Sequence, residues 1–196
     1  MVQSANPASE LRVFDLITVS RREYIRKTAA CALRKYFRLS ECPGTDDDLL
    51  QKLKAGVFVT IKENGDLRGC IGFVTPPTGF LQTVREAAVM AATEDPRFLP
   101  VTADDLERIE LEITILGSPK PFGNRDATSL KSLEIGKHGL IVESPFGRGL
   151  LLPQVALEWG FGVEEFLEAT CIKAGLKRDC WKDPGNKIFY FDALSF

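Results

Sequence analysis

The cysteine at position 70 has the sequence setting best suited to chemistry, because it lies between two glycines in Leu67-Arg68-Gly69-Cys70-Ile71-Gly72. A cysteine becomes a nucleophile when nearby positive charge or a paired base stabilises its thiolate. Arg68 lies two residues away, so in an ideal strand the two side chains share a face. Glycine packs nothing in a strand, so Gly69 and Gly72 indicate that another chain segment or a ligand approaches the backbone closely.

Two further side chains could move a proton for Cys70. His138 is the single histidine of the chain, and an unperturbed pKa of about 6.5 suits it to proton transfer at neutral pH. Glu112, on the polar face of a predicted strand, could orient His138 or serve as a base itself. These residues are the predicted catalytic set: Cys70, His138 and Glu112. The predicted substrate-binding residues are Arg68, Gly69, Arg97 and Gln154.

A structural role competes with each functional role. Cys70 could be a small side chain where space is short, since a free thiol mostly behaves as a small hydrophobe. His138 could be a hydrogen-bonded cap on the start of a strand, and Gln154 could merely satisfy backbone groups. The arginines could form ion pairs with Glu112 or Asp95 that only hold the structure together, because structural networks perturb charges as active sites do.

Hydrophobic patterning predicts the elements that must position these residues. Asn64-Gly65 follows the apolar run 57–61 and precedes the hexapeptide, which predicts a β-hairpin with Cys70 on its return strand. Alternation over 109–115 predicts a strand with Glu112 on its polar face. Between them, apolar residues at helical spacing predict a helix: Leu81, Val84, Ala88 and Ala91.

The second half of the chain repeats this order, which we interpret as a weak internal repeat of hairpin, helix and strand about 80 residues apart. Aligning the two hairpins on Leu67 and Leu150 places Cys70 beside Pro153, with Gln154 just beyond. If the halves pack around a pseudo-twofold axis, the two hairpin ends could face one cleft. The predicted elements are strands over 139–143 and 150–152, a helix over about 163–174 capped by Gly175, and a closing strand over 187–191.

The N-terminal part is predicted to be a flexible tail over residues 1–15, followed by a helix. Ser20-Arg21-Arg22-Glu23 fits a capping box, which starts this helix near Ser20. Its predicted buried face consists of Ile25, Ala29, Ala32, Leu33 and Tyr36. Residues 16–196 are predicted to be a single domain, with one lobe over about 45–118, a second over about 135–196, and the N-terminal helix packing on both.

The hexapeptide over 67–72 resembles the signature of the AMMECR domain family. Four further stretches agree with that family's pattern in the same order: Asp95-Pro96-Arg97-Phe98, 136–140, 150–156, and 171–176 followed by Trp181. The agreement spans roughly residues 20–196. It implies an α+β fold of two small antiparallel sheets with flanking helices, but no agreed activity. Family members occur beside, or fused to, Memo-like proteins and radical SAM enzymes, which implies a shared modification pathway.

Composition and charge argue against several classes of function. A formal charge of -2, from 25 basic and 27 acidic residues, argues against nucleic-acid binding. No apolar run approaches the roughly 20 residues that span a bilayer, and no signal peptide is evident. Five irregularly spaced cysteines do not suggest a disulfide framework, so we expect a reducing, cytoplasmic setting. His138 has no metal-ligand partner at the spacing of a known zinc motif, and whether the protein uses a cofactor is left open.

Two functional hypotheses follow. The first is a cytoplasmic, thiol-dependent enzyme with a cleft around the hexapeptide, acting on a small or peptide-borne substrate. Cys70 would be its thiol, His138 and Glu112 its proton-handling pair, and Arg68 and Arg97 its anchors for an anionic group. The alternative is a non-catalytic protein–protein interaction module or adaptor, whose cleft or exposed aromatic residues dock a Memo-like or radical SAM protein. Self-association is left open.

Overall fold

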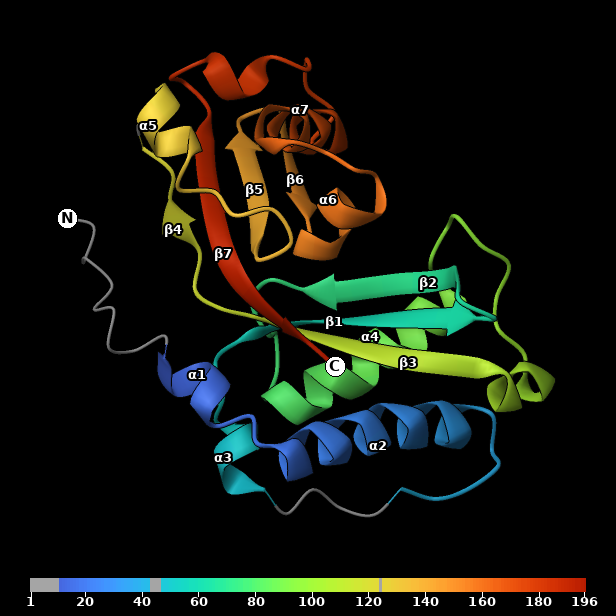
Figure 1. Ribbon diagram of the computed structural model, residues 1–196. Helices are drawn as coiled ribbons and strands as arrows, with labels where there is room; N and C mark the ends of the chain where they lie inside the picture. Colours follow the sequence, from blue (N-terminus) through green and yellow to red (C-terminus); the bar gives the residue numbers. More distant parts are fainter. Residues whose placement is uncertain (1–10, 43–46, 124) are drawn as a thin grey trace. The chain divides into compact units, whose positions relative to one another are not determined.

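The structure is a computed structural model that describes residues 11–42, 47–123 and 125–196 (Figure 1). The described residues form two compact units. Unit 1 contains the described residues up to Gly117 together with Leu194–Phe196, and unit 2 contains Ser118–Ala193. Both units combine helices with antiparallel strands, which confirms the predicted α+β class.

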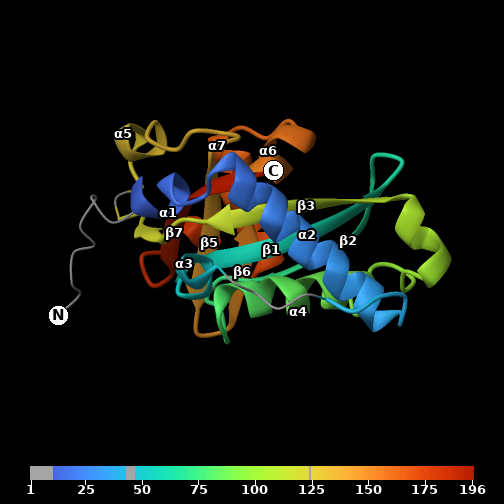
Figure 2. The ribbon, with the colours of Figure 1, turned by 90° about the horizontal axis from the view of Figure 1, so that it is seen from below.

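Unit 1 is a sheet in the order β2-β1-β3, with both main helices on one face. Helix α4 packs on β1 and β2, and α2 packs on α4 and β3, as Figure 2 shows from below. Ile113 of β3 exchanges two backbone hydrogen bonds with Phe196, at 2.8 and 3.0 Å. The elements are α1 (Leu11–Asp15), α2 (Val19–Tyr36), α3 (Asp48–Gln51), β1 (Gly56–Glu63), β2 (Asp66–Phe73), α4 (Phe80–Thr93), the 3₁₀ helix η2 (Ala103–Glu107) and β3 (Ile109–Leu116).

The predicted hairpin is confirmed, with one irregularity. Asn64 and Gly65 have φ angles of 54° and 86°, as the tight turn between β1 and β2 requires. Ile61 pairs with Gly69 and Lys62 pairs with Leu67, so Arg68 is an extra residue in β2. Such a β-bulge breaks the strict alternation of side chains along a strand. The alternation of an ideal strand, on which the shared face of Arg68 and Cys70 was predicted, therefore does not hold at this point of β2.

The close approach predicted at Gly69 is confirmed, and the approaching segment is α4. A Cβ atom on Gly69 would lie 2.1 Å from the backbone oxygen of Ala91. Only glycine therefore lets the helix pack this closely on β2. A Cβ on Gly72 would lie 2.3 Å from the Val57 oxygen of the neighbouring strand. Close backbone packing therefore explains why both positions of the hexapeptide are glycine.

Unit 2 has the strand order β4-β7-β5-β6 and repeats the connectivity of unit 1. In each unit the chain runs through a hairpin and a helix to a strand that pairs with the first strand of the hairpin. Gly149 of β6 lies against α7 as Gly69 lies against α4. The elements are β4 (Lys120–Pro121), α5 (Ala127–Leu130), β5 (His138–Ser144), β6 (Gly147–Leu151), α6 (Pro153–Glu158), α7 (Val163–Lys173), η3 (Cys180–Lys182) and β7 (Lys187–Ser195), whose last residues belong to unit 1.

Several predicted boundaries differ from the structure. Helix α2 begins at Val19, because extended Thr18 is its N-cap and accepts a hydrogen bond from the Arg21 N–H at 3.4 Å. The predicted capping box at Ser20 is therefore wrong, and Tyr36 is exposed rather than buried. Residues 11–15 form α1, whereas residues 1–10 of the predicted tail lie outside the described residues. Helix α6, with a proline at its first position, was not predicted.

Four cysteines form two disulfides, so the expectation that the cysteines build no disulfide framework, from which a reducing setting was inferred, is wrong. Cys31 bonds to Cys42, and Cys171 bonds to Cys180. Their Cα atoms lie 5.6 and 5.8 Å apart, within the usual range for a disulfide, although the pairs are 11 and 9 residues apart in sequence. Cys70 is the free cysteine of the described chain. None of the described helices combines the length and the apolarity that crossing a bilayer requires.

Candidate functional site

The backbone of Cys70 is covered by an ion pair between Asp95 and Arg97. Cys70 lies on β2, the last strand on its side of the unit 1 sheet. Its N–H donates to Asp95 Oδ2 at 2.9 Å, and its carbonyl accepts from Arg97 Nη2 at 3.5 Å. A strand at the side of a sheet leaves such groups unpaired, so Asp95 and Arg97 replace a neighbouring strand at this residue.

The same ion pair fixes the protonation state of Asp95. Arg97 Nε and Nη2 donate to the two carboxylate oxygens at 2.9 and 2.7 Å, and the Asp95 side chain is only 3% exposed. Hydrogen bonds from Arg97, together with the N–H of Cys70, hold the pKa of Asp95 at about 2. Asp95 in turn raises the pKa of Arg97. The positive charge of Arg97 is therefore largely compensated where it lies near Cys70.

The side chain of Cys70 lies in a row that crosses three strands. Cys70 pairs with Thr60 on β1, and Thr60 pairs with Glu112 on β3, so the three side chains share one face of the sheet. The Thr60 hydroxyl donates to Cys70 Sγ at 3.3 Å. Glu112 Oε2 lies 3.1 Å from Lys62 Nζ. The structure thus brings together Cys70 and Glu112, two members of the predicted catalytic set.

Burial decides the protonation state of this thiol. It raises the pKa of Cys70, and its effect exceeds the opposing effects of the Thr60 hydrogen bond and the Arg97 charge. The negative charges of Asp95 and Glu112 raise the pKa further. Cys70 is therefore a protonated thiol at neutral pH, whereas the nucleophilic form of cysteine is the thiolate.

Arg68 is directed to a loop. Its guanidinium donates to the carbonyl oxygens of Leu99 and Pro100, the latter at 3.2 Å, and its Nε lies 3.8 Å from Glu63 Oε2. Two backbone carbonyl groups and one carboxylate thus occupy most of the N–H donors of the Arg68 guanidinium. These contacts join the bulge of β2 to the segment that precedes η2.

The remaining predicted site residues, His138 and Gln154, lie in unit 2 on β5 and α6. His138 Nδ1 accepts the N–H of Glu134 at 3.0 Å, so its proton is on Nε2, which lies 3.6 Å from Asp192 Oδ1. Burial lowers the pKa of His138 despite the attraction of Asp192. The imidazole is therefore neutral at pH 7, and the Glu134 hydrogen bond matches the structural role considered for it.

Sequence reasoning missed the arrangement of the aromatic side chains that follow α6. Gly160 has a φ of 66° and its N–H donates to the Leu157 carbonyl, while the Phe161 N–H donates to the Ala156 carbonyl. This is a Schellman motif, which reverses the chain at a glycine. Trp159 and Phe161, on either side of the glycine, stack with ring centroids 6.2 Å apart and planes at 21°. The Trp-Gly-Phe sequence after an apolar helix was the available signal.

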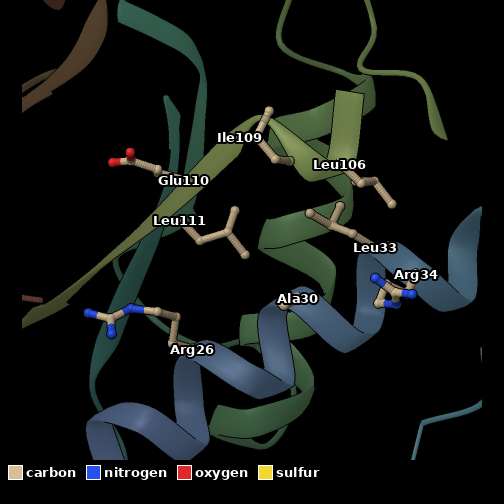
Figure 3. Close-up of a pocket in the computed structure, with 8 residues that line it drawn as sticks. All are labelled: Arg26, Ala30, Leu33, Arg34, Leu106, Ile109, Glu110 and Leu111. Atoms are coloured by element: carbon tan, nitrogen blue, oxygen red, sulfur yellow. The ribbon is translucent and has the colours of Figure 1, made fainter. Parts of the chain in front are cut away.

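Sequence reasoning also missed a cavity of about 500 Å³ in unit 1, between α2, η2 and β3 (Figure 3). None of the predicted site residues lines it. In residues 11–42, 47–123 and 125–196, no group of three histidine, cysteine or acidic side chains is placed to hold a metal ion.

Comparison with known proteins identifies relatives of similar length. The AMMECR1 family model matches residues 23–196. A protein of Methanothermobacter thermautotrophicus is 44% identical over 173 residues, covering 87% of this chain and 90% of the relative. A protein of Thermococcus gammatolerans is 40% identical over 181 residues, covering 89% and 88%. The crystal structure of an uncharacterised protein from Pyrococcus horikoshii superposes with a TM-score of 0.81 at 37% identity, covering 88% of this chain and 89% of that chain.

Proposed function

The chain belongs to the AMMECR1 family, and on that premise we propose that it is a non-catalytic protein–protein interaction module. The partner implied by the family resemblance is a Memo-like or radical SAM protein. The observation that carries the proposal is the aromatic pair of unit 2, in which the exposed Trp159 stacks on the half-buried Phe161.

The geometry of this pair suits a binding surface. The Trp159 side chain is 72% exposed, which leaves a large apolar group in water. Phe161 is half-buried and packs on the core of unit 2, and the Schellman motif fixes the backbone on both sides of Gly160. A rigid aromatic side chain loses little conformational entropy on binding, which is why tryptophan is common among residues that dominate interfaces.

Measuring the affinity of the full chain for each of the two candidate partner classes tests the proposal. A Memo-like protein and a radical SAM protein from the same organism are each mixed with the full chain, and the affinity is measured by calorimetry. Removing a dominant interface tryptophan costs about 2 kcal/mol or more, so Trp159→Ala should weaken binding about 30-fold. Tyr36→Ala is the matched control, because Tyr36 is an exposed aromatic residue of unit 1. Unchanged binding by Trp159→Ala, or no binding by either partner, would refute the proposal.

A thiol-dependent enzyme built around the hexapeptide is the second candidate. The observation in its favour is the row in which Cys70, the free thiol, shares a sheet face with Glu112. Glu112 would accept the thiol proton, and the predicted substrate contacts of unit 1 would come from Arg68 and Arg97. It ranks second because burial raises the pKa of Cys70, whereas a catalytic thiol needs a lowered one.

Alkylation kinetics separate the two candidates. The rate at Cys70 is mapped by mass spectrometry from about pH 5 to 9 on the native protein and on Glu112→Gln. The interaction module predicts slow alkylation, with an apparent pKa above the value of about 8.5 of an unperturbed thiol. An apparent pKa well below that value, together with slower alkylation of Glu112→Gln at neutral pH, would instead favour the enzyme.

A further inference from the structure

The unit 1 cavity has the size and walls of a small-molecule site. Its volume of about 500 Å³ falls in the range of roughly 300–1,000 Å³ that is usual for ligand pockets. Figure 3 shows apolar side chains from three elements facing the same space. These side chains are Leu33 of α2, Leu106 of η2, and Ile109 and Leu111 of β3. The last three are only half-buried, so the cavity has an apolar wall that is open to solvent.

The hollow exists because the side chain at its centre is small. Arg26, Ala30 and Arg34 follow one another at intervals of four residues, so they lie along one face of α2. Ala30 leaves empty the space that a longer side chain would fill against β3. The two arginines flank this space and lie about 12 Å apart along the helix, at 1.5 Å per residue.

The charged side chains that line the cavity differ in whether they have an ion-pair partner. Glu110 lines it, but its carboxylate extends to the other side of β3, as the alternation of a strand requires (Figure 3). Arg34 Nη1 lies 3.6 Å from a carboxylate oxygen of Glu107. Arg26 takes part in none of the ion pairs among the described residues, and its guanidinium lies 5.8 Å from the centre of the Phe196 ring. Contact with a ring face leaves the planar fork of donors available.

We propose that this cavity binds a small molecule with an apolar body and a single carboxylate. The apolar body would lie over Ala30 against Leu106 and Leu111, and the carboxylate would receive two parallel hydrogen bonds from Arg26. A guanidinium fork matches a carboxylate in geometry, and the charge of Arg26, which acts on Glu23 without forming an ion pair with it, can balance one negative charge. The site lies entirely in unit 1, so it goes beyond the interaction proposed for Trp159, and either proposal can fail alone.

Calorimetric titration of the full chain with octanoate and with octan-1-ol tests the proposal, because the two probes share a chain and differ in the carboxylate. The native protein should bind one octanoate at least tenfold more tightly than octan-1-ol. Arg26→Gln should remove that difference, while Lys27→Gln, the neighbouring exposed cation, should change the affinity less than twofold. Ala30→Leu should abolish binding of both probes. Ala169→Leu, which adds the same volume on α7, should not.

Three results would overturn the proposal: no saturable binding of octanoate, equal affinity for the two probes, or unchanged binding by Ala30→Leu. Circular dichroism establishes that each variant is folded. If Ala30→Leu does not fold, Arg26→Gln compared with Lys27→Gln decides the question. If Ala30→Leu blocks a partner protein while octanoate does not bind, the cavity accepts a protein side chain, which also overturns the proposal.

Discussion

Replacing Asp95 by Asn tests the role assigned to the ion pair that covers Cys70. The pKa of Asp95 lies at about 2, against an ordinary value of 3.8. One pKa unit corresponds to about 1.36 kcal/mol, so the ionised carboxylate adds about 2.5 kcal/mol to the free energy of unfolding. Asparagine keeps the shape and one acceptor for the Cys70 N–H, but it removes the charge that Arg97 requires. Asp95→Asn should therefore cost about 2.5 kcal/mol at pH 7.

The pH dependence gives this prediction its sharpest form. The pKa of Asp95 is lower in the folded than in the unfolded chain, so its contribution is complete above about pH 5 and is lost as the pH falls toward 2. Urea unfolding followed by circular dichroism at pH 7, 4 and 2.5 measures the difference between native protein and variant. The difference should shrink steadily over that range.

A control on the same strand isolates the effect. Asp66 is exposed at the start of β2, so Asp66→Asn should change the free energy of unfolding by less than about 0.5 kcal/mol at each pH. If the cost of Asp95→Asn is the same at pH 7 and pH 2.5, or no larger than that of Asp66→Asn, the ion pair does not stabilise the strand as described.

Two further predictions concern Gly69 and His138. Gly69→Ala would place a Cβ 2.1 Å from the Ala91 oxygen, so it should lower the free energy of unfolding in urea by about 1–3 kcal/mol. Gly123→Ala, with open space around it, should change that free energy by less than about 1 kcal/mol. Equal effects of the two substitutions would contradict the close approach of α4. His138 gives the single histidine signal in a proton NMR titration, and the midpoint of that titration should lie below about 6.5 because burial lowers the pKa of His138. The unfolded chain takes up this proton at a higher pH than the folded chain, so the free energy of unfolding should fall as the pH drops below about 6.5. A midpoint above about 6.5 would mean that the attraction of Asp192 outweighs the effect of burial.

Sequence reasoning succeeded where the determining interactions are local. The Asn64-Gly65 turn, the strand of Glu112 and the helix carrying Ala91 follow from φ preferences and from the periods of strand and helix, which neighbouring residues decide. The two disulfides were missed because they depend on how loops return in space. The bulge at Arg68 was missed because its register is set by pairing with β1.

At the candidate sites, too, the features that depend on local sequence were predicted and those that depend on tertiary contacts were not. The sequence singled out Cys70 and Glu112, and strand alternation with the correct register brings them to one face. It could not predict that Asp95, 25 residues later, would accept the Cys70 N–H, or that burial would raise the thiol pKa. The cavity over Ala30 also escaped prediction, because a small residue on a helix face leaves a hollow only where the facing elements do not fill it.

The hydrogen bonds between Ile113 and Phe196 can form only after the last residues of the chain have been translated. Thr114 and its partner Ser195 are 81 residues apart, and all of unit 2 is translated between them. At about 5–20 residues per second, the ribosome needs about 4–16 s to deliver residues 194–196 after β3 has emerged. During that interval Ile113 lacks its strand partner, and such an unpaired edge can join another nascent chain on the same messenger. Crowded polysomes should therefore be where this protein is most exposed to misassembly.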